Sequence, residues 1–333
     1  MSDRFRLFGA ELSPYSVKVR SALRAKQLPF DWIVRDQEHM PEFQRLAKLP
    51  LIPLLVTPKQ EVLQDSTPIL EWLEERQPEP GFHPGDPRLR FLSELLEEFG
   101  DEWGNKWMFH TRWARRVDQD SAAARLVDEM NPGLPADARA GAVEKLRERM
   151  VGRVWFVGSN ERNAPRIEAS FRETAALLES HLATRPYLLG ARPAFADFGL
   201  APQLYELWTD PTPKQLLEER APRVVAWVQR MLAPRAEAGF ERFEALRPTL
   251  APLLAQQVGR LFLPWADANA RAIESGAESF EVHLAGEPWQ QKPQKYHARS
   301  LAELRRKYRA VAGDPDLDGL LRETHCLEWL QSA

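Results

Sequence analysis

The segment Ser13-Pro14-Tyr15-Ser16-Val17-Lys18-Val19-Arg20 most constrains the fold of this chain. It follows residues 4–8, where apolar and basic side chains alternate as in a half-buried strand. Serine is a favoured helix N-cap and proline is favoured at the first helical position. Apolar and aromatic side chains then recur at positions 15, 19, 22 and 23, the spacing of one buried helix face. The pattern predicts a strand that leads directly into an amphipathic helix.

A helix start of this kind favours negative charge. Its first backbone N–H groups have no partner within the helix, and the helix dipole adds a partial positive charge there. Ser13 therefore stands where an anion such as a thiolate is stabilised. The structural alternative is that Ser13 is a plain N-cap.

Composition limits the class of protein. A chain of 333 residues with 44% hydrophobic content can bury a large core, and its length favours two domains. The net charge of −3 argues against a nucleic-acid or anionic-membrane binder. A single cysteine, Cys326, excludes an internal disulfide and a cysteine-rich zinc site. Neither an apolar leader nor a long apolar run is present, so we expect a cytoplasmic protein with no membrane span.

The first 80 residues follow a recognisable order of elements. Strands are predicted at 4–8 and 30–34 around a helix at 14–26, followed by a short helix at 41–47. An apolar strand at 49–56 and a second one at 62–64 form a hairpin, and Asp65-Ser66-Thr67-Pro68 begins a further helix. This order is the thioredoxin-like arrangement.

Four spaced features make these residues resemble the amino-terminal domain of the glutathione transferase superfamily. They are the segment 13–20, Glu38-His39 before Pro41-Glu42-Phe43, Ile52-Pro53, and Asp65-Ser66 at a helix start. The resemblance implies an α/β thioredoxin-like domain over residues 1–80 and an all-α domain over residues 87–245. The proline-rich segment 78–86 is then the linker. Residues 246–333 form a carboxy-terminal extension, which we expect to pack on the helical domain.

The helical domain shows periodic segments separated by breaker residues. Helices are predicted at 88–119, 136–153, 165–183, 196–208 and 222–233. Residues 187–197 resemble the folding signature of the family, although Ala194 stands where Ser or Thr is usual. In the extension we expect helices at 251–275, 300–311 and 316–330, and a strand at 280–284 followed by a turn at 285–288.

The resemblance also implies a chemistry. Glutathione would be the co-substrate, and the Ser13 hydroxyl would donate a hydrogen bond to its thiolate, with Tyr15 as a second hydroxyl or as an aromatic packed beneath the helix. Ile52 and a cis Pro53 would contact the cysteinyl part, while Asp65 and Ser66 would hold the γ-glutamyl end or act as ordinary caps. His39 matches the contact to the glycine carboxylate. Leu51 replaces the usual Lys or Gln there, which implies loose binding.

The helical domain would supply the pocket for the second substrate. Trp103, Trp107 and His110 share one helix face, and Arg112 follows closely. These residues either form an aromatic substrate pocket or belong to the core between the domains. No HxxxH or HExxH pattern occurs, so we expect no metal site.

The leading hypothesis is a cytoplasmic glutathione S-transferase-like enzyme that activates the glutathione thiolate for attack on an apolar or aromatic electrophile. Two alternatives remain open, a non-catalytic binding or scaffold protein of the same fold and a glutathione-dependent isomerase or reductase. The resemblance implies a homodimer, whereas an extension that covered the dimer surface would enforce a monomer. Neither nucleic acid nor membrane is expected as a partner.

Overall fold

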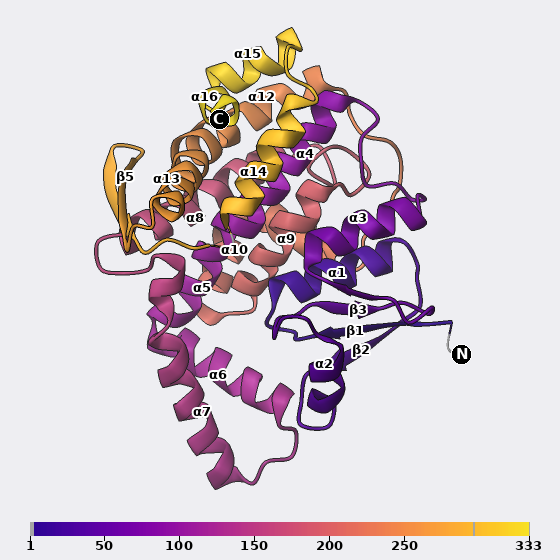
Figure 1. Cartoon of the computed structure of the whole chain (residues 1–333), viewed down its shortest axis with the longest axis vertical. Coiled ribbons are helices and arrows are strands. Elements are labelled where there is room, and N and C mark those ends of the chain that lie inside the picture. Colours follow the sequence, from indigo (N-terminus) through magenta and orange to yellow (C-terminus); the bar gives the residue numbers. More distant parts are fainter. Residues whose placement is uncertain (1–2, 296, 333) are drawn as a thin grey trace.

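The computed structural model describes residues 3–295 and 297–332 and confirms a thioredoxin-like unit followed by helices. A four-stranded sheet in the order β2-β1-β3-β4 lies beside a larger helical body (Figure 1). The elements of this unit are β1 (Phe5–Gly9), α1 (Pro14–Ala25), β2 (Phe30–Val34), α2 (Met40–Leu46), β3 (Leu54–Val56), β4 (Val62–Gln64) and α3 (Ser66–Arg76).

The sheet is mixed, with β1 parallel to β2 and antiparallel to β3. The predicted strand at 49–56 is shorter than expected and begins at Leu54. Proline cannot donate a ladder hydrogen bond, and Pro50 and Pro53 both lie in the missing part. The core of this unit is apolar, with Leu7, Val19 and Leu55 fully buried.

The helical body begins at Pro87, after a linker that contains no regular element from 77 to 86. Its helices are α4 (Pro87–Phe99), α5 (Asn105–Ala114), α6 (Arg116–Met130), α7 (Ala136–Val151), α8 (Ala164–His181), α9 (Phe195–Trp208), α10 (Pro211–Arg220) and α11 (Pro222–Met231), with a short 3₁₀ turn at Val154–Val157. Helix α10 has no counterpart among the predicted elements. Helices α6 and α7 form a hairpin that projects below the body in the view of Figure 1.

The predicted helix 88–119 is divided into three parts. A π-helical turn at Gly100–Gly104 separates α4 from α5, and extended backbone at Arg115 separates α5 from α6. At the turn α4 approaches α9 so closely that a Cβ on Gly100 would lie 2.6 Å from the Gly199 backbone. Glycine at both positions therefore permits direct backbone contact between these two helices.

The extension contains α12 (Phe243–Leu253), a π-helical segment at Leu254–Phe262, α13 (Leu263–Glu274), β5 (Phe280–Leu284), β6 (Glu287–Gln291), α14 (His297–Arg309), α15 (Pro315–Glu323) and α16 (Leu327–Gln331). The first of these helices begins earlier than predicted, and β6 occupies part of the predicted turn. The predicted helix 316–330 is two helices, because His325 adopts a left-handed φ of 59° between them.

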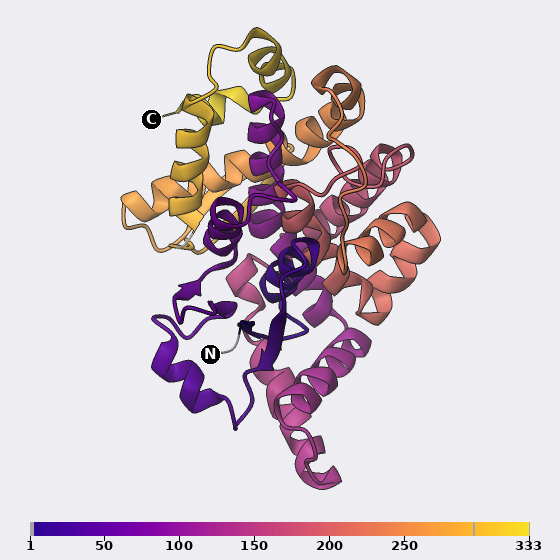
Figure 2. The same cartoon turned by 90° about the vertical axis from the view of Figure 1, so that its right-hand side faces the viewer.

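The extension packs against the helical body at two places. On one side Tyr308 of α14 packs on Phe91 of α4, with ring centroids 5.6 Å apart. On the other side Trp265 of α13 and Trp289 of β6 pack against Trp103. Figure 2, turned from the first view, shows α14 running alongside α4.

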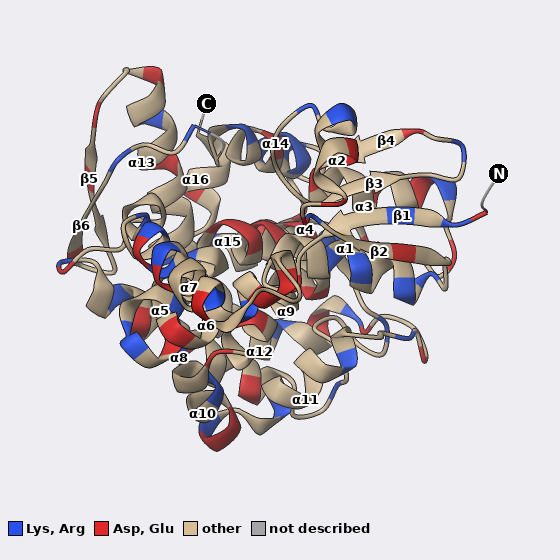
Figure 3. Cartoon of the chain, turned by 90° about the horizontal axis from the view of Figure 1, so that it is seen from below, with Lys and Arg blue, Asp and Glu red and all other residues tan. Residues whose placement is uncertain are grey.

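The surface carries mixed charge. Lys and Arg (blue) lie among Asp and Glu (red) over the helices in Figure 3. Within the described ranges, none of the helices is long and apolar enough to cross a membrane.

Candidate functional site

The register of the sheet brings the predicted glutathione-binding residues to the same edge of the domain, which we call the glutathione edge. Phe8 pairs with Leu54, and Leu54 pairs with Gln64. The β1–α1 loop with Ser13, the loop that ends in Pro53, and the start of α3 at Ser66 therefore leave the sheet at the same edge. Gly9 pairs with Val34, so the chain that leads to His39 also leaves from that edge.

Ser13 is the N-cap of α1, as predicted. Its Oγ accepts a hydrogen bond from the Ser16 backbone N–H at 3.3 Å. A serine hydroxyl has one hydrogen to donate as well as two lone pairs, and among the described residues no acceptor is found for that hydrogen. Ser13 is half-buried, so its hydroxyl can donate to a molecule at the helix start.

Tyr15 points elsewhere. Its hydroxyl donates to the backbone carbonyl of Asp101 at 2.9 Å, in the π-helical turn. The hydroxyl hydrogen is thus already used, which favours the packed-aromatic alternative over a second thiolate donor.

The loop before Ser13 is held in place by a buried network. The Glu11 carboxylate accepts hydrogen bonds from Arg20 at 2.9 Å and from the Tyr205 hydroxyl at 2.6 Å. Burial would raise the pKa of Glu11, but these donors outweigh it and hold the pKa below its usual range. The Glu11 backbone N–H donates to Glu129 at 2.7 Å. Helices α1, α6 and α9 therefore fix the loop jointly.

The Ile52–Pro53 peptide bond is cis, as the resemblance implies. The preceding residues 48–51 are fixed by Gln64, whose side-chain amide donates to the carbonyls of Leu49 and Leu51, each at 2.7 Å. Leu51 is 55% exposed, so its side chain projects from the binding edge.

Asp65 and Ser66 lie at the start of α3. Asp65 has φ +82° and ψ 135°, an unusual conformation for a residue with a side chain, and it makes no side-chain cap hydrogen bond. Ser66 is the first helical residue and is 2% exposed. Strained backbone of this kind often marks a functional position, which favours a binding role for Asp65 over ordinary capping.

A buried lysine connects this helix start to the helical body. The Lys18 ammonium donates to Thr67 Oγ1 at 2.9 Å and to Asp101 Oδ2 at 2.5 Å, and it also pairs with Glu97. Burial lowers the pKa of Lys18, but the two carboxylates more than offset that effect and raise it overall. The sequence signal was a basic residue between two buried valines. Its acidic partners, far along the chain, could not be identified from sequence.

His39 lies at the start of α2 and is partly exposed. Its Nδ1 is 2.8 Å from Asp36 Oδ1, which also accepts from the His39 backbone N–H at 2.9 Å. The ring orientation is therefore set by Asp36, and the contact to a glycine carboxylate stays a prediction.

The tryptophans predicted to line a substrate pocket lie in the interior. Trp103 and Trp107 are fully buried, and both indole N–H groups donate to Ser170 Oγ, at 2.9 and 3.0 Å. The space beside Trp103 is filled by Trp265 and Trp289 of the extension, at centroid distances of 5.9 and 5.5 Å. This placement favours the core alternative, because the extension supplies the aromatic rings that a substrate would otherwise contact.

His110 and Arg112 are also buried. His110 Nδ1 lies 2.7 Å from Ser159 Oγ, and burial lowers the pKa of this imidazole. Arg112 donates to Asp210 at 2.7 Å and to Glu206 at 2.8 Å. A further bond at 3.3 Å reaches the backbone carbonyl of Leu12, so Arg112 supports the loop that carries Ser13.

A cluster with possible metal ligands was not evident in the sequence. Single ligand atoms of Glu71, His83 and Glu94 lie within 4.8 Å of one another. The Lys307 ammonium of α14 lies 3.5 Å from Glu71 and 3.8 Å from Glu94. A protein cation therefore already balances the carboxylates, and we assign the cluster to the packing of the extension.

Comparisons with known proteins identify two domains in the chain. Residues 7–81 match the family model of the glutathione S-transferase N-terminal domain, and residues 161–230 match that of the C-terminal domain. FtsZ-localized protein A of Caulobacter vibrioides is 31% identical over 209 residues, covering 61% of this chain and 77% of that protein. Glutathione S-transferase U16 of Arabidopsis thaliana is 26% identical over 137 residues, covering 40% of this chain and 57% of that protein.

Among solved structures, the beta-etherase LigF of Sphingobium sp. strain SYK-6 superimposes with a TM-score of 0.50 at 20% identity, covering 74% of this chain and 98% of that one. This likeness concerns the fold. The two domain matches and the 31% identical relative lead to one conclusion: the chain belongs to the glutathione S-transferase superfamily.

Proposed function

We propose that this protein is a glutathione transferase-like enzyme in which the Ser13 hydroxyl and the first amides of α1 stabilise the thiolate of bound glutathione. The observation that carries the proposal is the Ser13 hydroxyl, which caps the helix as an acceptor and has, among the described residues, no acceptor for its own hydrogen. A free thiol has a pKa of about 8.5, and a helix N-terminus with a nearby donor lowers it by about one unit or more.

The remaining parts of glutathione would lie along the same edge. The backbone of Ile52 and Pro53 suits the cysteinyl part, and Asp65 with Ser66 suits the charged γ-glutamyl end. His39 is the proposed contact for the glycine carboxylate. We propose glutathione as co-substrate and no metal in the reaction.

The proposed second substrate is an apolar or aromatic electrophile. Leu12, directly before Ser13, packs with the partly buried Phe109 and Leu126 against the cluster around Trp113. This apolar surface beside Ser13 replaces Trp103 and Trp107 as the proposed wall of the electrophile site.

Substitution of Ser13 by alanine tests the proposal. We expect the variant to lose about tenfold to a hundredfold in kcat/KM toward a model aryl halide, because a hydrogen bond to a charged group contributes about 1.5–3 kcal/mol. The pKa of bound glutathione, followed by thiolate absorbance, should rise in parallel. The exposed Ser180 on α8 provides the control variant Ser180→Ala. An active parent whose rate and thiol pKa are unchanged by Ser13→Ala would exclude this role.

A second candidate is a binding protein of the same fold. The 31% identical relative is named for its localisation with FtsZ, and Leu51 weakens the expected glutathione contact. Calorimetric titration with glutathione separates the two candidates. Binding is expected of the enzyme, and the absence of any heat at millimolar glutathione would support the binding protein. A glutathione-dependent isomerase or reductase would bind glutathione but leave no conjugate in product mass spectra.

We also propose a cytoplasmic homodimer. A reduced compartment suits the buried free thiol of Cys326. Light scattering at several concentrations tests the dimer, and a mass of one chain throughout would contradict it.

A further inference from the structure

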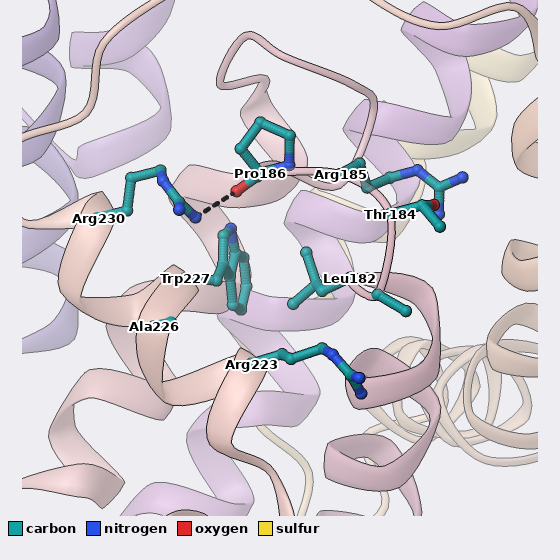
Figure 4. A pocket seen from close by; sticks show the side chains of 9 residues that line it. Leu182, Thr184, Arg185, Pro186, Arg223, Ala226, Trp227 and Arg230 are labelled. Atoms are coloured by element: carbon teal, nitrogen blue, oxygen red, sulfur yellow. Dashed lines mark hydrogen bonds between the residues drawn. The ribbon is translucent and has the colours of Figure 1, made fainter.

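The exposed aromatic side chains of this protein lie together at one turn. Among the described residues, five large hydrophobic side chains are exposed, and the two aromatic ones are Trp155, 55% exposed, and Phe156, 47% exposed. Trp227 shows the more usual placement of tryptophan in this chain, since it lies between Arg223 and Arg230 on α11 (Figure 4) and is only 1% exposed. Trp155 and Phe156 are therefore the aromatic side chains most available to a partner.

The exposure of the two rings follows from the 3₁₀ turn Val154–Val157. In a 3₁₀ helix, residues i and i+3 lie on the same side. Val157 is 2% exposed, and Val154 packs against the apolar cluster between α5, α6 and α7. With both valines inside, Trp155 and Phe156 point outward. The turn is also fixed by the extension, because the side-chain amide of Gln291 donates to the Phe156 carbonyl at 3.4 Å.

A row of cations leads along the second half of α7 to these rings. Lys145, Arg149 and Arg153 follow one another at intervals of four residues, so they lie on one face about one helical turn apart. Phe156 follows Arg153 by three residues and continues the same face. All three cations are exposed, and in the described part of the chain none of them is paired with a carboxylate.

The acidic residues nearby do not neutralise this row. Glu148 is the only carboxylate that the sequence contains from 145 to 156. Glu144, directly before the row, is already paired with Arg147. A further cation stands on the other side of the turn, where the Lys292 ammonium lies 5.6 Å from the centroid of the Trp155 ring. We call the following residues the aromatic–basic patch: Lys145, Arg149, Arg153, Trp155, Phe156 and Lys292.

The chemistry of the aromatic–basic patch fits an acidic segment of another protein. Cations one turn apart match carboxylates at the same spacing on a helix, and apolar side chains at the end of that helix would cover the two rings. Tryptophan and arginine are also the side chains that contribute most to protein–protein binding. The net charge of −3 for the whole chain disfavours nucleic acid or an anionic membrane as the occupant.

We infer that the aromatic–basic patch binds an acidic amphipathic helix of a partner protein. Its carboxylates lie on the row of cations, and its apolar side chains lie on Trp155 and Phe156. The inference does not depend on glutathione binding.

Fluorescence anisotropy of a labelled synthetic peptide, titrated with the full chain, tests the inference. The probe is a helical peptide with one glutamate per turn along one face and with leucine and phenylalanine at the end of that face. We expect a Kd below about 1 mM that weakens by about threefold or more from low to physiological salt, since exposed charges are screened. The same peptide with glutamine in place of each glutamate should bind about tenfold more weakly.

Two double variants test the two parts of the patch separately. Trp155→Ser with Phe156→Ser removes the apolar rings, and Arg149→Glu with Arg153→Glu reverses the charge of the row. All four side chains are exposed, so we expect both variants to fold, and each should weaken peptide binding by about tenfold or more. The matched control is Arg220→Glu, at an exposed arginine of α10, which should bind the peptide as the parent does.

Several results would overturn the inference. They are a Kd above about 1 mM for the parent, equal binding of the glutamine peptide, and parent-like binding by either double variant. A loss in Arg220→Glu as large as that in the charge-reversed variant would show that position on the surface does not matter. Tighter binding of phosphatidylglycerol vesicles or of single-stranded DNA than of the peptide would show that the occupant is another class of anion.

Discussion

At the scale of single residues, Leu51 is the side chain at the glutathione edge whose substitution we expect to increase glutathione affinity. It is 55% exposed beside Ile52, where the superfamily resemblance implies a Lys or Gln. We expect Leu51→Lys to tighten glutathione binding by up to about fivefold, since an exposed charge pair contributes up to about 1 kcal/mol.

Leu49→Lys is the matched control for that measurement, because Leu49 is 53% exposed and lies two residues earlier. Titration calorimetry at low salt compares the two variants. Equal gains in both would show that added positive charge acts generally and that position 51 has no special contact.

His181 leads to a prediction about how the free energy of unfolding depends on pH. Burial lowers the pKa of its imidazole from 6.5 to about 4, while Nε2 donates to the Leu188 carbonyl at 2.7 Å. As pH falls from 6.5 toward 4, the unfolded chain gains a proton on this residue before the folded chain does. The free energy of unfolding should therefore fall by up to about 1.4 kcal/mol per pH unit on this account.

His181→Gln should remove this contribution, because glutamine can still donate to the carbonyl but does not titrate. Urea unfolding across the same pH window measures the slope in both proteins. At pH 8 the imidazole is neutral in both the folded and the unfolded state. The difference between the two unfolding free energies at that pH therefore reports the changed hydrogen bonds alone. A parent and a variant with equal slopes would contradict the assignment.

At the scale of elements, Lys18 joins α1, α3 and α4. Its ammonium contacts Thr67 at 2.9 Å and the carboxylates of Asp101 and Glu97. Lys18→Met leaves two buried acidic groups without their cation, so we expect a loss of about 3–5 kcal/mol in unfolding free energy. Glutathione affinity should fall too, because the start of α3 loses a fixed contact.

Arg116→Met is the comparison for Lys18→Met. It breaks an exposed pair with Asp120 at 2.8 Å on one helix, which contributes at most about 1 kcal/mol. Chemical denaturation of both variants gives the two values. Similar small losses would mean that the Lys18 cluster is hydrated in solution.

Elements with strong local signals were predictable from the sequence. The helix at 14–26, with Ser13 and Pro14 at its start, matches α1, and the strand at 30–34 matches β2. The π-helical turn was not predictable, because it depends on the contact of Gly100 with Gly199 from a distant helix. The end of α15 lacks the usual glycine, since His325 takes the left-handed conformation there.

In the candidate site too, some features were predictable from local sequence signals and others depend on distant contacts. The resemblance to the superfamily implied that Ser13, Pro53 and Ser66 lie at one edge, and the motifs that carry this resemblance are local and visible in the sequence. The support of that edge by Glu11, Tyr205 and Arg112 depends on contacts between residues that are 100 and 194 positions apart in the sequence. Helical spacing grouped Trp103 with Trp107, but it could not show that the extension supplies further tryptophans beside them.

At the scale of the whole molecule, Gln291 joins the extension to the helical body. Its Oε1 accepts hydrogen bonds from the indoles of Trp265 at 3.0 Å and Trp289 at 3.2 Å, and from Lys106 at 3.4 Å. Gln291→Ala leaves the two buried indole N–H groups without their acceptor, so we expect a loss of at least about 2 kcal/mol. Limited proteolysis between β5 and α14 should also become faster.

Gln290→Ala, at the exposed neighbouring position, is the control for both measurements. It should resemble the parent in stability and in cleavage rate. Unchanged proteolysis in Gln291→Ala would show that the extension is held by its apolar contacts alone.

The packing of Trp265 and Trp289 against Trp103 also affects biosynthesis. During translation, Trp103 leaves the ribosome long before its aromatic neighbours from α13 and β6 have been made. The nascent helical body therefore exposes an apolar surface until the last quarter of the chain emerges, and such surfaces recruit chaperones or aggregate. Premature termination after α12 would leave that surface exposed permanently, so truncated products should be insoluble even though both superfamily domains are complete.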